Sequence, residues 1–139
     1  MDEVGDGLFV GTFTDASDAE CLAEHGIELL VSLTHARPNG DSPSTVRTHP
    51  MTDGPQNERS AFEAAVGSVR AGLDAETTLL VHCQSGASRS PAVAATALAL
   101  ERESDLETAF RRVAERRDAV DPHPALVRQA ARVYTASRS

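Results

Sequence analysis

The sequence predicts a single α/β domain over residues 1–139, with helices flanking a central, mostly parallel sheet of about four to five strands. Short apolar segments of strand character alternate along the chain with segments of helical spacing. The chain has 139 residues, of which 40% are hydrophobic, so it can bury a core and is not disordered by composition. It contains no internal repeat and no linker that would divide it.

The first half of the chain gives three strands and one helix. Asp6-Gly7 is typical of a hairpin turn between Val4 and a strand at 8–10. Residues 16–25 have helical character, and Gly26 is well placed to end that helix. The apolar segment 27–33 then predicts a buried strand, and a polar loop at 35–44 leads to a short strand at 45–49.

The second half is mainly helical. Asn57 is the expected N-cap of a helix whose apolar residues recur on one face from Ala61 to Leu73. A buried strand at 77–81 follows, and then an Ala-rich helix from Pro91 to Arg102, where Pro91 suits the first turn. The remaining elements are a helix to Arg117 opened by a capping box at 104–107, and a helix after Pro122 and Pro124 that ends near Thr135.

The charge composition excludes some partners. All 13 basic residues are Arg, and 21 acidic residues bring the formal net charge to −8. No basic stripe is present to neutralise phosphates, so we expect no nucleic-acid partner. A lysine-free, acidic, Ala-rich chain is typical of an extreme halophile, although codon bias alone explains the composition equally well. No apolar run approaches the roughly 20 residues of a membrane span, and no signal region follows the acidic N-terminus, so we expect a cytoplasmic protein.

The two cysteines have different surroundings. Two cysteines alone imply no disulfide framework. Cys21 lies beside Ala19, Leu22 and Ala23 on the expected helix 16–25, which indicates a packed side chain. Cys83 instead ends a predicted strand and precedes a helix, which indicates a reactive thiol.

The segment from Cys83 to Arg89 has the pattern of an anion site. A tight turn into a helix N-terminus directs successive backbone N–H groups at one point, and Gly86 lets the chain curl. Arg89 lies six residues after Cys83, so its planar guanidinium can close the ring on a phosphate. The positive electrostatic field of the helix N-terminus and Arg89 also stabilises a thiolate, and we therefore expect Cys83 to be ionised at neutral pH.

These residues resemble the signature of the cysteine phosphatase superfamily: His-Cys, five residues, then Arg and Ser or Thr. The loop is most similar to that of dual-specificity phosphatases, with matches at Gly86, Ser88, Arg89 and Ser90. Further similarity covers nearly the whole chain: Leu8–Gly11, Gly26-Ile27, and the segment from Arg117 through Pro122 to Gln129. The resemblance implies the cysteine-phosphatase fold and hydrolysis of phosphotyrosine, phosphoserine or phosphothreonine in a phosphorylated protein substrate.

The resemblance also implies roles for individual residues. Cys83 is the expected nucleophile, Arg89 the phosphate clamp, Ser90 a hydrogen-bond partner that helps the sulfur leave, and His82 the residue that orients the loop. The general acid is expected about thirty residues upstream on a mobile loop. Asp53 lies thirty residues before Cys83, and Asp41 is the backup. The expected phosphate-binding backbone belongs to Gln84, Ser85, Gly86, Ala87, Ser88 and Arg89.

Other polar residues receive plainer interpretations. Arg37 and Arg47 are candidate substrate contacts, although solvation at the surface explains both. The basic run at 111–117 is interpreted as a solvated helix face with some ion pairs. His35, His49 and His123 lack metal-ligand spacing, so we assign no metal, and no cofactor is implied.

Several functions stay open at this point. The same chemistry suits a small phosphorylated metabolite or an RNA 5′ phosphate. A rhodanese-type sulfurtransferase also places a Cys in an anion-binding loop, but it would not need His82, Ser90 or an upstream acid. A non-catalytic phosphoprotein-binding module is the third class, and such modules usually lack the Cys or the Arg that are both present here.

Overall fold

A five-stranded sheet with helices on both faces forms the protein. The computed structural model describes residues 1–38 and 45–138. The strands are β1 (Asp2–Gly5), β2 (Leu8–Gly11), β3 (Leu29–Ser32), β4 (Thr45–Thr48) and β5 (Leu79–His82). The helices are α1 (Phe13–Ala16), α2 (Ala19–Glu24), α3 (Arg59–Asp74), α4 (Arg89–Glu101), α5 (Leu106–Arg116) and α6 (Pro124–Arg138). The predicted α/β fold is therefore confirmed.

The strand order is β1-β2-β5-β3-β4, with β1 antiparallel to β2 and all other neighbours parallel. Since parallel strands end at the same edge of a sheet, the segments that follow β2, β3, β4 and β5 all leave from one edge. His82 closes the central strand there, between Gly11 of β2 and Ser32 of β3. This edge gathers the loops that carry the candidate site residues.

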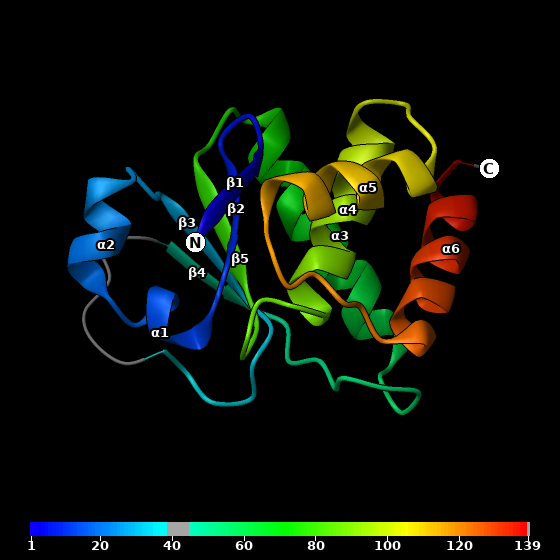
Figure 1. Ribbon diagram of the computed structural model, residues 1–139, viewed down its shortest axis with the longest axis horizontal. Helices are drawn as coiled ribbons and strands as arrows, with labels where there is room; N and C mark the ends of the chain where they lie inside the picture. Colours follow the sequence, from blue (N-terminus) through cyan, green and yellow to red (C-terminus); the bar gives the residue numbers. More distant parts are fainter. Residues whose placement is uncertain (39–44, 139) are drawn as a thin grey trace.

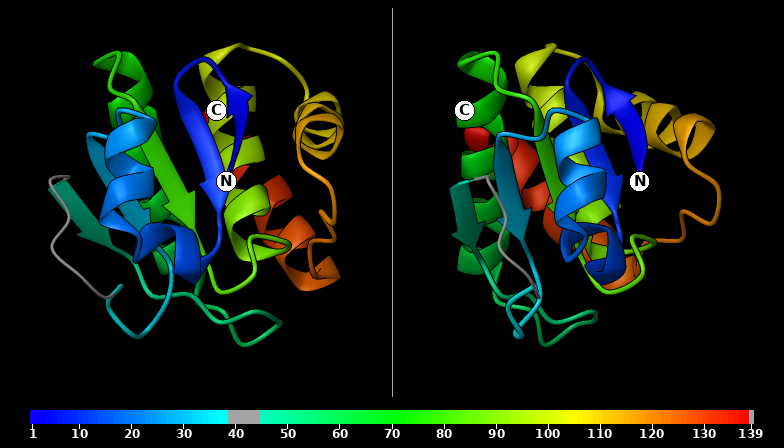
Figure 2. Two further views of the ribbon diagram at one scale, coloured as in Figure 1. Left: turned by 60° about the vertical axis from the view of Figure 1, so that its left-hand side comes forward. Right: turned by 90° about the vertical axis from the view of Figure 1, so that its left-hand side faces the viewer.

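The two faces of the sheet are covered unequally. Helices α1 and α2 lie on one face, and α3 to α6 lie on the other (Figures 1 and 2). Because strand side chains alternate between faces, Leu80 packs on the small cluster beneath α1 and α2, whereas Leu79 and Val81 enter the large core. Cys83 continues that alternation and also lies in the large core.

Helix α4 forms the centre of the large core. Every residue from Ser90 to Leu100 is buried, and the helix contacts β2 and β5 as well as α3, α5 and α6. Its alanines allow neighbouring elements to approach closely, so the apolar Ala-rich segment is a buried helix, as predicted. None of the helices in residues 1–38 and 45–138 is long and apolar enough to cross a membrane.

Local features of two predicted helices, and the burial expected for Cys21, were wrong. The expected helix 16–25 is two short helices, because Asp18 caps a new start by accepting from the Cys21 N–H. Asp105 rather than Ser104 caps α5, since its carboxylate accepts from Thr108 N. Cys21 is half-buried rather than packed, with Sγ 3.8 Å from Nδ1 of His25.

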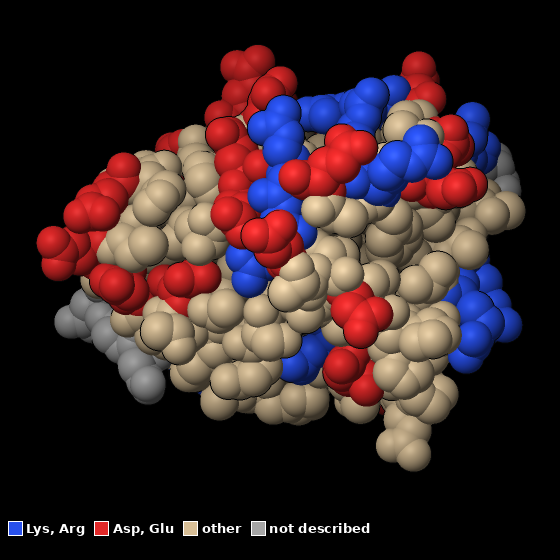
Figure 3. Space-filling view, in the orientation of Figure 1, with Lys and Arg blue, Asp and Glu red and all other residues tan. Residues whose placement is uncertain are grey.

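Charge is distributed unevenly along the chain. Residues 1–36 contain eight acidic residues and no Arg, so this segment alone accounts for the formal net charge of −8. Figure 3 shows acidic side chains without basic ones over α1 and α2, while the arginines gather toward the α5 side. The two regions are joined at the β1–β2 hairpin, where Asp6 in the turn pairs with Arg102, and Asp2 on β1 pairs with Arg117.

Candidate active site

Cys83 lies at the base of a loop between the central strand and the central helix. Strand β5 ends at His82, and α4 begins at Arg89, so residues 83–88 form the connection, which we call the phosphate loop. Only 2% of Cys83 is exposed. Its Sγ lies 3.1 Å from Oγ of Ser90, and the backbone N–H of Ser90 donates to it at 3.4 Å. The predicted pair of Cys83 and Ser90 is therefore together at the start of α4.

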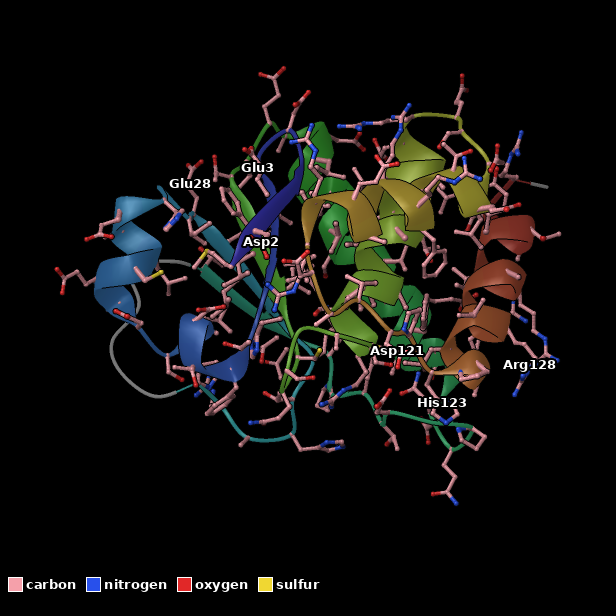
Figure 4. The ribbon with its side chains drawn as sticks, viewed as in Figure 1. Asp2, Glu3, Glu28, Asp121, His123 and Arg128 are labelled. Carbon is pink, nitrogen blue, oxygen red and sulfur yellow. The ribbon has the colours of Figure 1, made fainter. Side chains whose placement is uncertain are left out.

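The carbonyl groups of the phosphate loop are held from outside the loop. Phe13 N donates to the Gln84 carbonyl at 3.1 Å, and Asp121 N donates to the Ala87 carbonyl at 2.8 Å. Asp121 lies where the segment before α6 meets this loop (Figure 4). Carbonyl and N–H groups of one trans peptide point in opposite directions, so each such bond turns the following N–H to the other side.

The side chain of Arg117 binds the two carbonyls that lie between those of Gln84 and Ala87. Its Nε donates to the Gly86 carbonyl at 2.8 Å, and its Nη2 donates to the Ser85 carbonyl at 3.3 Å. The interpretation of the basic run as a solvated face was therefore wrong for Arg117, whose side chain is only 12% exposed. Four successive carbonyls of the loop thus have partners on its outer side. Within residues 1–38 and 45–138, nothing accepts from the backbone N–H groups of residues 84–88.

Gly86 permits this curl. Its φ is +67°, in the left-handed region that favours glycine. A Cβ at this position would lie 2.5 Å from Nη2 of Arg117 and 2.8 Å from the Gly11 carbonyl oxygen. The loop therefore requires glycine both for its dihedral angle and for its close approach to β2.

His82 is a buried, neutral residue behind the loop. It is fully buried, and burial lowers its pKa to about 4, with the positive charge of Arg89 acting in the same direction. Its Nδ1 lies 3.3 Å from the Cys83 carbonyl and its Nε2 lies 2.8 Å from Oγ of Ser32. A carbonyl can only accept, so Nδ1 carries the proton and Nε2 accepts from the Ser32 hydroxyl. The ring thereby connects the end of β3 to the base of the phosphate loop.

Asp53 reaches the phosphate loop from the segment after β4. Its Oδ1 accepts from Oγ of Ser88 at 2.5 Å, and Oγ of Ser88 accepts in turn from the backbone N–H of His123 at 2.8 Å. Asp53 itself is exposed to solvent. The alternative acid, Asp41, lies outside the described residues, and Arg37 and Arg47 are both exposed.

The segment 51–57 that carries Asp53, here called the acid loop, is fastened at several points. The buried residue Asn57 accepts from Thr52 N at 2.8 Å through Oδ1 and donates to Oε1 of Gln129 at 2.9 Å through Nδ2. Gln129 on α6 returns a bond to the Asn57 carbonyl at 2.5 Å. Arg89 Nη1 donates to the Met51 carbonyl at 2.9 Å, so the expected phosphate clamp also contacts this loop.

The sequence matches a known family over most of its length. Residues 8–135 match the family described as "Dual specificity phosphatase, catalytic domain". The chain belongs to the dual specificity phosphatase family. It is a cysteine-dependent dual specificity phosphatase, as the loop sequence predicted.

Individual relatives agree with this assignment. Human dual specificity phosphatase 28 is 31% identical over 123 residues, covering 87% of this chain and 70% of the relative. Human dual specificity protein phosphatase 2 is 30% identical over 118 residues, which are 84% of this chain but only 38% of the relative. The crystal structure of human dual specificity phosphatase 28 superposes with a TM-score of 0.90 at 26% identity, covering 99% of this chain and 98% of that one. A mouse dual specificity phosphatase complexed with zinc tungstate gives a TM-score of 0.89 at 25% identity, covering 99% and 87%.

Sequence reasoning about this phosphatase missed the residues that hold the site in place. Asn57 was expected to cap α3, but Glu58 occupies that position and Asn57 anchors the acid loop instead. Gln129 was noted only within the resemblance of the C-terminal segment, and Arg117 only there and in the basic run at 111–117. Their spacing from Pro122 was the available signal, but it gave no indication of which atoms they bind.

The remaining histidines do not form a metal site in the described structure. His49 Nε2 lies 2.7 Å from Oγ of Ser68 on α3, and Nδ1 of His123 accepts from Ala125 N at the start of α6. Within residues 1–38 and 45–138, no group of three or more His, Cys, Asp and Glu side chains could hold a metal ion.

Proposed function

We propose that this phosphatase hydrolyses phosphate monoesters on tyrosine, serine or threonine side chains of proteins through a phosphocysteine intermediate on Cys83. The observation that carries the proposal is the polarity of the phosphate loop. Four successive carbonyls are bound on its outer side, and the intervening N–H groups are left to face a ligand above the Cys83 sulfur. Such a ring of donors fits the equatorial oxygens of a tetrahedral phosphoryl group.

In the first step, the Cys83 thiolate attacks phosphorus opposite the leaving oxygen. The S–P bond forms as the P–O bond breaks, and the N–H groups of residues 84–89 together with the Arg89 guanidinium stabilise the phosphoryl oxygens. Asp53 supplies a proton to the leaving alkoxide or phenoxide. Its bond to Ser88 supports this role, because it holds the carboxyl group beside the loop and leaves Oδ2 free to carry the proton.

In the second step, water attacks the phosphocysteine. Asp53, now a carboxylate, accepts a proton from the water as the new P–O bond forms and the S–P bond breaks. The departing sulfur recovers its negative charge. Ser90 can donate to that sulfur from both its hydroxyl and its backbone N–H, at 3.1 and 3.4 Å. Inorganic phosphate then leaves.

The rim of the site supports a broad choice of phosphoester. Gln84, Ser85 and Asp53 are exposed, so the acid lies at the mouth of the site and can reach both short alkyl and longer aryl leaving groups. The mouse relative bound to zinc tungstate supports an oxyanion ligand, since tungstate has the tetrahedral form of phosphate. The acidic surface supports a phosphoprotein substrate rather than a nucleic acid.

The test compares hydrolysis of an aryl phosphate, an alkyl phosphate and a panel of phosphopeptides by wild type, Cys83→Ser and Asp53→Asn. We expect no measurable turnover by Cys83→Ser, and for Asp53→Asn a larger loss on the alkyl than on the aryl phosphate, because the poorer leaving group needs the proton more. Cys21→Ser and Asp74→Asn are matched controls that should retain wild-type rates. Burial and the nearby carboxylates raise the pKa of the Cys21 thiol, which disfavours its thiolate form.

Two outcomes would refute the proposal. Wild-type turnover by Cys83→Ser would exclude the phosphocysteine route. Rapid hydrolysis of phosphometabolites or an RNA 5′ phosphate, with none of the phosphopeptides, would exclude the protein substrate. Each assay should be run in low and in high salt, because an acidic, lysine-free chain from a halophile would need salt to stay folded.

A further inference from the structure

We propose that Arg117 is a positioning residue that fixes the aim of the phosphate-binding N–H groups, and that Asp2 of β1 holds Arg117 in place. This inference rests on the proposed function of the phosphate loop. It assigns a role to a residue that touches neither the sulfur nor the substrate. The observation behind it is a single guanidinium shared between two adjacent loop carbonyls and the N-terminal strand.

Arg117 leaves its own helix in order to reach the loop. It is the C-cap of α5 and has extended backbone, with φ −137° and ψ 123°, so its side chain departs from the exposed face of that helix. Its neighbours Arg112 and Arg116 remain exposed. Arg117 instead lies behind the phosphate loop, where it also donates to the Val10 carbonyl at 3.4 Å.

The contacts fix two successive peptide planes. The Ser85 carbonyl belongs to the peptide whose N–H is that of Gly86, and the Gly86 carbonyl belongs to the peptide whose N–H is that of Ala87. Because the two groups of a peptide point in opposite directions, binding both carbonyls on the outer side directs both N–H groups inward. A planar guanidinium can grip two neighbouring carbonyls from Nε and Nη2 at once, which an ammonium group cannot.

Without this grip the loop could rearrange at Gly86. Glycine accepts dihedral angles of either sign with little penalty, so nothing in the local backbone prevents these peptides from turning. The space that a Cβ would need at Gly86 is already occupied by Nη2 of Arg117. The absence of a side chain at Gly86 therefore makes room for the guanidinium of Arg117, which in turn fixes the conformation of the loop.

Asp2 supplies the remaining partner of the guanidinium. Its Oδ2 accepts from Nη1 of Arg117 at 2.8 Å, and Asp2 pairs with Val10 in the β1–β2 register. The carboxylate both orients the guanidinium and balances its charge. The hairpin at the start of the chain is thereby connected to the catalytic loop through one side chain.

The test measures steady-state kinetics and competitive inhibition by tungstate for Arg117→Met, Arg117→Lys and Asp2→Asn. Arg116→Met is the matched control, since it removes the same charge from the adjacent exposed position. We expect Arg117→Met to raise the tungstate inhibition constant and to lower kcat/KM by about 100-fold, comparable to losing one aimed oxyanion donor. Arg117→Lys should recover only a small part, because it restores charge without the planar grip. Asp2→Asn should have an effect of the same kind but smaller.

The outcomes separate this inference from the proposed function. Tungstate inhibition and kcat/KM of Arg117→Met equal to those of Arg116→Met would overturn the inference, while wild-type turnover and inactive Cys83→Ser would leave the proposed function standing. Full recovery by Arg117→Lys would also overturn it, because charge alone would then suffice. If Arg117→Met does not fold, Asp2→Ala decides the question, because it removes the acceptor as well as the charge. Unchanged tungstate binding by that folded variant contradicts the role of Asp2 and of the contact it supports.

Discussion

The phosphate loop and the acid loop meet at the same edge of the sheet but are held in different ways. The carbonyls of the phosphate loop are bound from behind by the body of the protein, through backbone N–H groups and the side chain of Arg117. The acid loop is fastened by side chains, namely Asn57 and Gln129 at one end and Ser88 at Asp53. The phosphate loop is thus fixed through its backbone, whereas the acid loop is fixed through side-chain contacts.

This difference matches the roles that we propose for the two loops. Backbone donors stabilise a transition state only if they are already aimed before the charge develops, so the phosphate loop must not move. A general acid needs only one oxygen within reach of the leaving group, and an exposed side chain such as Asp53 can adjust. We therefore expect changes to the phosphate loop to cost more than changes to the acid loop.

Among changes that leave Cys83 in place, the largest effect is expected for Gly86→Ala. The new Cβ would meet Arg117 and the Gly11 carbonyl, and the residue would be forced to a φ of +67°. We expect kcat/KM to fall about 1000-fold, as for loss of aimed oxyanion donors. Gly67→Ala is the control, because nothing lies within 4 Å of its added Cβ and alanine favours the helix α3 by about 0.5–1 kcal/mol. A Gly86→Ala enzyme with wild-type kinetics would show that the loop tolerates another conformation.

The next effect is a pH dependence of the free energy of unfolding, caused by His82 at the base of the phosphate loop. The pKa of His82 is lowered from 6.5 to about 4 in the folded state, so the unfolded chain binds the extra proton first as the pH falls. The neutral histidine therefore contributes stability above about pH 6.5, and this contribution is lost progressively down to about pH 4, about 3 kcal/mol in all.

Urea unfolding across that pH range measures the effect. Burial also lowers the pKa of His49, and the pKa of Asp15 is lowered as well. Both groups titrate in wild type and in the variant alike, so the comparison with His82→Asn isolates the contribution of His82. The variant should lose less stability on acidification than wild type. Equal losses in the two proteins would contradict a neutral His82.

The same contrast explains what could be predicted from the sequence. The phosphate loop was predictable because its requirements are local: a strand, a Cys, a glycine and an Arg at fixed spacing before a helix. The sheet followed from apolar segments such as 79–81, whose residues are fully buried and whose apolar run is visible in the local sequence alone. Asn57 and Arg117 were misinterpreted because each binds atoms far away in the chain, at Gln129, Gly86 and Asp2. Capping propensity and charge pattern describe only a residue's near neighbours.

A smaller effect is expected when the acid loop is released from α6. Asn57→Ala removes a buried amide that bonds Thr52 and Gln129, which should lower the free energy of unfolding by about 2 kcal/mol. Gln129→Ala should lower it as well, and the double variant should show less than the sum, because both changes break the same bond. Gln56→Ala, an exposed neighbour, is the control. Additive losses measured by chemical unfolding would show that the two amides act independently.

The smallest effect is expected for Ser88→Ala, which removes the hydroxyl between the two loops. The hydroxyl donates to Asp53 and accepts from His123 N, so its loss frees the acid without touching Cys83 or Arg89. We expect the rate on an alkyl phosphate to fall about tenfold, and the rate on an aryl phosphate to fall less, because the better leaving group depends less on the proton. Ser88→Thr keeps the hydroxyl and should recover most of the difference. Equal losses on both substrates would show that Ser88 acts through the phosphate loop. The contact between the two loops would then serve phosphate binding rather than the positioning of Asp53.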